Sequence, residues 1–124
     1  MGVDWIRFCR ARNFLVEAPD VDVILPDGRR HRVTVEEKEN SYLINAIVIK
    51  KRMANQINDL AIQTWIRNRV TSIVGFRVDT KGRLLAEAWV PKLGLSKEEF
   101  QFYLNTLAME ADRFEYELTG EDVE

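Results

Sequence analysis

The chain contains one cysteine, Cys9, and one histidine, His31, the residue types that most often supply a nucleophile, a general base or a metal ligand. Together they could form a thiolate nucleophile and its base. However, Cys9 lies at helical spacing from Trp5 on an apolar face, and His31 lies in an alternating, strand-like run. We interpret Cys9 as a buried structural residue and His31 as a half-exposed strand residue. One residue of each type cannot complete a zinc site of the usual Cys/His count.

Carboxylates are numerous, but their spacing does not predict an acid–base pair. Glu110 and Glu117 flank Arg113 at three and four residues, which is ordinary pairing on a helix surface. The segment Asp79-Thr-Lys-Gly lacks the alternating ligands and terminal Glu of a calcium loop. The sequence has no phosphate-binding or dinucleotide-binding glycine motif and no nucleophile elbow. It therefore predicts a protein that is not an enzyme and that uses no metal or cofactor.

Basic residues gather in Arg29-Arg-His-Arg32 and in Lys50-Lys-Arg52. If the first segment is a strand, Arg30 and Arg32 point the same way and could meet an acidic peptide or phosphates. Single-stranded nucleic acid favours interleaved aromatic side chains, which this cluster lacks, and the net charge of the chain is −2. Three interpretations stay open: a solvated face, an acidic protein partner, and weak nucleic-acid binding through residues 29–32.

Length and composition predict a single domain over residues 1–124, because 46% of these 124 residues are hydrophobic, enough for one core. The apolar runs are far shorter than the roughly 20 residues of a membrane span. No apolar signal segment is evident near Met1, and a lone cysteine cannot form an internal disulfide. We expect a cytoplasmic protein without membrane contact.

Hydrophobic periodicity predicts an α+β domain in the order helix, three-stranded antiparallel meander, helix, β-hairpin and C-terminal helix. Asp4 could cap the first helix, and Pro19 must lie beyond its end because proline lacks an amide donor. Residues 14–17 could belong to this helix or be extended. The strands of the meander are predicted over residues 21–25, 30–35 and 42–49.

A second helix is predicted over about residues 52–70, with apolar side chains on more than half of its circumference. A helix this apolar is expected to pack on its own sheet and, in so short a chain, also on a second subunit. Trp89 and the small residues of its predicted strand point to opposite faces, so Trp89 is a further interface candidate. Several of the interface candidates could instead belong to the core of a single subunit. The predicted dimer-interface residues are Ile57, Leu60, Ile62, Trp65, Ile66 and Trp89.

The last part of the chain has the clearest local signals. Residues 73–78 and 84–90 are predicted to form a hairpin with Gly82 in its turn. Ser96 and Glu99 predict a capping box at the start of the C-terminal helix, and Gly120 predicts its end. Its predicted buried stripe is Phe100, Tyr103, Leu104, Leu107, Ala111, Phe114 and Leu118.

Several segments of residues 42–118 carry a family resemblance. They are Gly75-Phe-Arg-Val-Asp-Thr-Lys-Gly-Arg-Leu, the joint Pro91…Gly94-Leu-Ser-Lys-Glu-Glu-Phe, Ala111-Asp-Arg-Phe114 and Asn68-Arg69. The chain resembles the bacterial YbjN-like domain, a family named for sensory transduction regulation, and its element order is similar to the type III secretion chaperone fold. The resemblance implies a dimeric, protein-binding fold.

Secretion chaperones bind extended clients along their first helix and sheet, so this resemblance implicates a partner surface. The implicated residues are Trp5, Phe8, Arg30 and Arg32. The leading hypothesis is a non-enzymatic homodimer that binds another protein as a chaperone-like adaptor or regulator. The alternative is a small-ligand-binding domain or small enzyme with a helix–sheet pocket where Asn45, Asn68 and Tyr103 converge.

Overall fold

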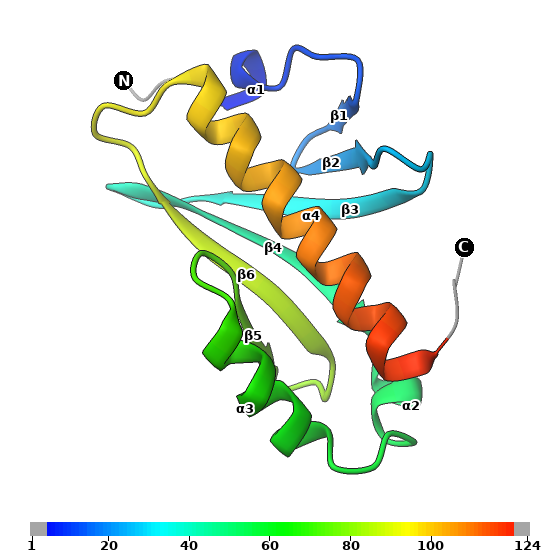
Figure 1. The fold of residues 1–124 in the computed structure, drawn as a ribbon. Coiled ribbons are helices and arrows are strands. Elements are labelled where there is room, and N and C mark those ends of the chain that lie inside the picture. The colour runs from blue at the N-terminus through cyan, green and yellow to red at the C-terminus, as the bar shows by residue number, and fades with distance from the viewer. Residues whose placement is uncertain (1–4, 121–124) are drawn as a thin grey trace.

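A computed structural model describes residues 5–120 of the protein. All six strands form one antiparallel sheet in the order β1-β2-β3-β4-β6-β5 (Figure 1). The strands are β1 (Phe14–Glu17), β2 (Asp20–Ile24), β3 (Arg30–Glu37), β4 (Ser41–Ile49), β5 (Gly75–Val78) and β6 (Leu84–Pro91). The helices are α1 (Trp5–Phe8), α2 (Lys51–Ala54), α3 (Leu60–Val70) and α4 (Lys97–Thr119). The α+β class predicted from the sequence is confirmed.

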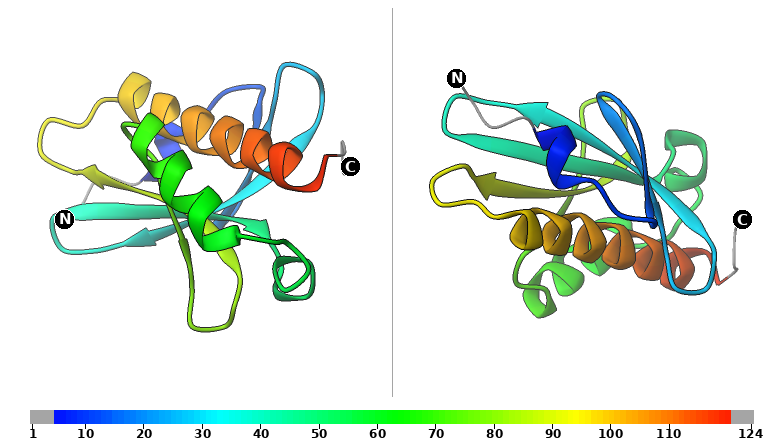
Figure 2. Two further views of the ribbon diagram at one scale, coloured as in Figure 1. Left: turned by 60° about the horizontal axis from the view of Figure 1, so that its bottom comes forward. Right: turned by 90° about the horizontal axis from the view of Figure 1, so that it is seen from above.

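The long helix α4 crosses one face of the sheet and packs on β2, β3, β4 and β6. Both α1 and α3 lie on the same side as α4, α1 beside its start and α3 beside its second half (Figure 2). Within residues 5–120, no helix crosses the opposite face of the central strands (Figure 2). The domain therefore has one helical layer and one largely uncovered sheet face.

The core lies between α4 and the sheet and follows the strand alternation. Leu104 and Leu107 of α4 have no exposed surface, and small residues such as Ala86 and Ala88 on β6 let the helix approach closely. The predicted stripe is confirmed at its centre, whereas Tyr103 and Leu118 at its margins are only partly buried. Ser96 and Glu99 form the predicted capping box, and Gly120 ends the helix in a left-handed conformation.

At the beginning of the chain, residues 14–17 adopt the extended one of the two conformations that the sequence left open. Helix α1 is only 4 residues long, and Phe14–Glu17 is the additional strand β1. Phe14 is buried and pairs with Val23 of β2, so tertiary packing favours the extended alternative for this segment. The meander thus has four strands rather than three, and β6 joins it to complete the six-stranded sheet. The predicted cap Asp4 lies outside the described residues.

The predicted helix over residues 52–70 is wrong in its continuity, because it is divided into α2 and α3. Asp59 lies in the break in the left-handed conformation, with φ of 57°. Asn and Asp adopt this conformation more readily than other non-glycine residues, and Asn55, Asn58 and Asp59 all fall between the two helices. Apolar residues continue at helical spacing on both sides of this break, so the sequence pattern did not indicate it.

The burial of Leu104 leads to a stability prediction. Leu104→Ala should lower the free energy of unfolding by about 2 to 5 kcal/mol, because it leaves a cavity under α4. Leu93→Ala is the matched control, since Leu93 is 97% exposed, and its effect should stay within about 0.5 kcal/mol. Urea unfolding followed by circular dichroism measures both changes. Equal effects of the two substitutions would contradict this packing.

Candidate functional site

Helix α3 presents an apolar face to solvent. Ile62, Trp65 and Ile66 are 58%, 60% and 53% exposed, and their spacing of three and four residues places them on one side of the helix. Val70, in the last turn, is 74% exposed. A contiguous apolar surface of this kind is the usual mark of a protein-interaction site. We call these four residues the α3 apolar face.

The opposite side of α3 is held firmly to the domain. The guanidinium of Arg67 donates to Glu110 of α4 at 2.8 Å and to Glu117 at 2.6 Å, and it lies 5.6 Å from the ring centre of Phe114. The side-chain amide of Asn68 accepts from the backbone N–H of Phe76 and donates to the same residue's carbonyl. These contacts fix the helix so that its apolar face points outward.

The six residues predicted for a dimer interface fall into three places. Ile57 and Leu60 are partly buried and pack against the core. Ile62, Trp65 and Ile66 lie together on the α3 apolar face. Trp89 is 56% exposed on β6, but its neighbours Ala88 and Val90 are buried on the helical side. Since alternate strand residues face opposite ways, Trp89 lies on the uncovered face of the sheet, separate from α3.

The sheet splits between β3 and β4. These strands pair only from Thr34 opposite Asn45 to Glu37 opposite Tyr42. The first half of β3 pairs with β2 alone, and the second half of β4 pairs with β6 alone. A cleft of about 990 Å³ opens where the strands part. We call it the β3–β4 cleft.

The β3–β4 cleft unites both basic segments of the sequence. Arg30 and Arg32 line it from β3, Lys50 from the end of β4, and Arg83 from the start of β6. The Arg83 guanidinium is paired with Asp79 at 2.7 Å. Among the ion pairs formed within the described part of the chain, none includes Arg30 or Lys50, and both residues are exposed. The charges of these two residues are therefore available to a ligand.

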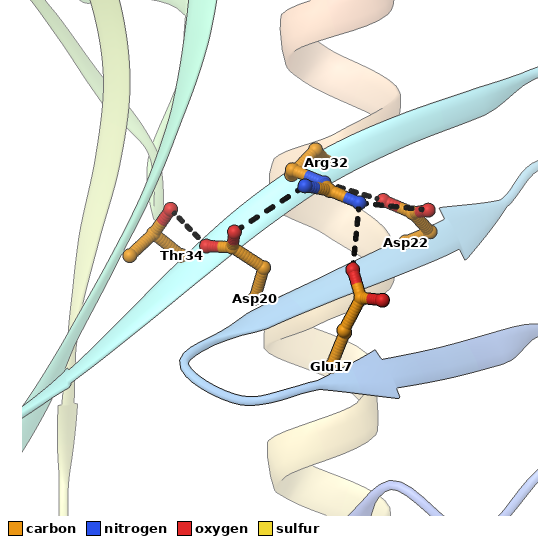
Figure 3. Close-up of polar contacts among 5 residues, drawn as sticks. All are labelled: Glu17, Asp20, Asp22, Arg32 and Thr34. Carbon is orange, nitrogen blue, oxygen red and sulfur yellow. Dashed lines mark hydrogen bonds and ion pairs between the residues drawn. The ribbon is translucent and has the colours of Figure 1, made fainter.

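Arg32 is instead engaged by its own domain (Figure 3). Its guanidinium lies 2.9 Å from Asp22, and 3.4 Å from both Asp20 and Glu17. The hydrogen bond from Arg32 lowers the pKa of Asp22 below its ordinary value, and the same contact raises the pKa of Arg32. Thr34 donates to Asp20 at 2.8 Å and completes the network. The positive charge of Arg32 is thus already compensated within the domain by three carboxylates.

A polar cluster lies on the helical side of the same cleft. The Nε2 atom of His31 is 3.1 Å from the carbonyl oxygen of Ile47, so its ring bridges the separated strands. Burial lowers the pKa of His31. Burial, with a smaller contribution from the nearby carboxylate of Asp112, raises the pKa of Glu115. Arg29 forms an ion pair with Asp112.

The remaining predicted residues are mainly structural. Trp5 and Phe8 place their rings 6.3 and 5.6 Å from that of Phe100, and Trp5 is only 9% exposed. Little of the Trp5 side chain is therefore accessible to a partner that binds along α1. Cys9 is 3% exposed, as predicted.

The three polar residues of the pocket hypothesis are not brought together. Asn45 lines the β3–β4 cleft, whereas Asn68 is bound to the backbone of Phe76 and does not line it, nor does Tyr103. The cleft is instead defined by strand separation, a feature that the sequence pattern did not indicate.

Comparison with known protein families and with curated proteins gives no match to this chain. No helix within residues 5–120 has the length and apolar character needed to cross a bilayer. Interpretation of the site therefore depends on the geometry described above.

The Arg32 network leads to a pH prediction. Arg32→Gln should lower the unfolding free energy at pH 7 only slightly, because exposed ion pairs contribute little. Asp22 has a lowered pKa in the folded state, so its contribution is complete above its unfolded pKa of about 3.9 and is lost as the pH falls through the folded value. The difference between wild type and variant, measured by urea unfolding, should shrink below about pH 4.

Arg52→Gln is the control, since Arg52 is exposed and forms no ion pair among the described residues. Its stability difference from wild type should be small and nearly independent of pH. A difference for Arg32→Gln that persists undiminished at pH 3 would contradict the assigned contact with Asp22.

Proposed function

We propose that this protein is a non-enzymatic protein-binding module that acts as a homodimer, in the manner of a chaperone-like adaptor or regulator. One observation carries the proposal: three large apolar side chains are more than half exposed on a helix whose other side is anchored by ion pairs. Exposure of a Trp and two Ile residues to water is unfavourable, and their burial against a partner is the simplest compensation.

A second copy of the chain fits the α3 apolar face. In a two-fold dimer the same patch meets itself, so two α3 helices would pair their Ile62, Trp65 and Ile66 side chains. Arg69 lies over the Trp65 ring at 5.0 Å and would form part of a polar rim. A second apolar row on α4 lies in the same helical layer and would extend the interface. Its members are Phe102, Met109 and Tyr116, spaced seven residues apart and 55%, 37% and 50% exposed.

The β3–β4 cleft suits a different partner, an acidic segment of another protein. The charges of Arg30 and Lys50 are available there, and the two parted strands leave backbone groups without a ladder partner between them. An extended peptide could use those groups as well as the positive charge. Nucleic acid is the competing ligand, and it is disfavoured by the lack of interleaved aromatic residues in this basic cluster.

The homodimer makes a direct prediction. Ile66→Glu should raise the dissociation constant of the dimer at least about 30-fold, because it places a charge at the centre of the apolar interface. Sedimentation equilibrium across a concentration series measures this constant. Leu93→Glu adds the same charge at a fully exposed loop position and should leave the constant unchanged. A wild-type chain that stays monomeric throughout would overturn the dimer.

The acidic partner is tested with a fluorescent oligoglutamate peptide. Arg30→Glu combined with Lys50→Glu should weaken its binding at least about tenfold, since two attractive charges become repulsive. Arg10→Glu combined with Arg52→Glu is the charge-matched control outside the cleft lining. Similar weakening in both double variants would indicate a general charge effect. Preference for a single-stranded oligonucleotide, with steep salt dependence, would favour the nucleic-acid alternative.

A further inference from the structure

Three potential metal ligands meet on the helical side of the β3–β4 cleft. His31 of β3 and the two α4 residues Asp112 and Glu115 each offer one ligand atom, and these atoms lie within 4.8 Å of one another. Asp112 and Glu115 are three residues apart, so both project from the same side of α4 toward His31. All three side chains are partly buried.

The ring of His31 is held as a metal ligand is usually held. A carbonyl oxygen can only accept, so the 3.1 Å contact with Ile47 is a hydrogen bond donated by Nε2–H. In the neutral ring, Nδ1 then keeps the free lone pair. Metal-binding histidines commonly donate their second N–H to a backbone carbonyl, which fixes the tautomer and orientation of the ring.

The charge of the cluster favours a cation. Two carboxylates and one guanidinium surround the imidazole, so acidic groups outnumber basic side chains in the cluster. Arg29 contacts Oδ2 of Asp112, and the second carboxylate oxygen remains for an ion. The carboxylate of Glu115 accepts no hydrogen bond and forms no ion pair within residues 5–120. Arg30 and Arg32 flank His31 in β3 and therefore project from the other face of the sheet.

An ion could reach this position from solvent. His31 and Glu115 both line the open β3–β4 cleft, which also has room for water ligands. Zn²⁺ binds imidazole nitrogen and carboxylate oxygen at about 2.0–2.2 Å, which places neighbouring tetrahedral ligands about 3.4 Å apart. The three ligand atoms would therefore have to approach one another by about 1 Å or more. Such an adjustment of three side chains on the cleft wall requires no change of fold.

We propose that His31, Asp112 and Glu115 bind a divalent transition-metal ion of the Zn²⁺ type, with water completing its coordination. The ion would connect β3 to the last turns of α4 at the point where β3 has no ladder contact with β4. This inference goes beyond the proposed function, and its test needs neither the dimer nor a protein partner.

The test uses the untagged full chain, stripped of metal, and titrates it with ZnCl₂ by calorimetry and with CoCl₂ by visible absorption. One Zn²⁺ per chain should bind, and Co²⁺ should show ligand-field bands. His31→Gln keeps a side-chain N–H for the carbonyl of Ile47, and Glu115→Gln is isosteric. Each substitution should lower the affinity for Zn²⁺ at least about tenfold. Glu98→Gln is the matched control, an exposed acid in the first turn of α4, and should bind like wild type.

Either of two results would overturn the metal site: no Zn²⁺ binding by the wild-type chain, or equal affinity in wild type, His31→Gln and Glu115→Gln. The second result would assign the ion to other surface carboxylates. Urea unfolding without metal checks that each variant is folded. If His31→Gln is unfolded, the affinity of Glu115→Gln and its Co²⁺ spectrum decide the question, because loss of one carboxylate ligand changes both.

Discussion

The rest of the structure depends on the packing of one helix, α4, across a six-stranded sheet. Neighbouring strands lie about 4.8 Å apart and a helix is about 10 Å wide, yet α4 packs on β2, β3, β4 and β6 because it runs across the sheet (Figure 1). Alanines at Ala86 and Ala88 bring α4 close to β6, and Leu104 and Leu107 fill the space between them. Helix α3 packs on the edge strand β5, and α1 packs beside the start of α4. The uncovered face is the consequence of having a single helical layer.

The two candidate surfaces exist because a single layer of helices leaves parts of the helices and of the sheet exposed. Helix α3 is anchored by Arg67 and Asn68, polar contacts that use one side of the helix and leave its apolar side outward. The β3–β4 cleft arises because the twist of β3 follows β2 while the second half of β4 follows β6. One surface is apolar and suited to a copy of the chain, and the other is polar and charged. They lie on different elements, so dimerisation through α3 would leave the cleft open.

Much of the fold could be predicted from the sequence because its signals are local. The capping box at Ser96 and the apolar stripe of α4 depend on residues within a few turns of each other, and both were confirmed. The strand at Phe14–Glu17 could not be separated from a helix, because its identity depends on pairing with β2. The break at Asp59 was hidden by apolar residues that continue at helical spacing on both sides. Arg32 looked available for a partner because its three carboxylates come from β1 and β2.

The polar cluster at His31 shows why site chemistry is harder to predict than fold. A count of cysteines and histidines excludes the common zinc motifs, yet it does not consider carboxylates brought in by a distant helix. Asp112 and Glu115 have the spacing of ordinary helix-surface acids, and only the position of α4 over the end of β3 gives them a histidine neighbour. The one available signal was the acidity of the last part of the sequence, where residues 96–124 hold nine acids against two basic residues. Two of these carboxylates, Asp112 and Glu115, lie beside His31 at the point where β3 and β4 separate, and the spacing of acids along the sequence does not show this.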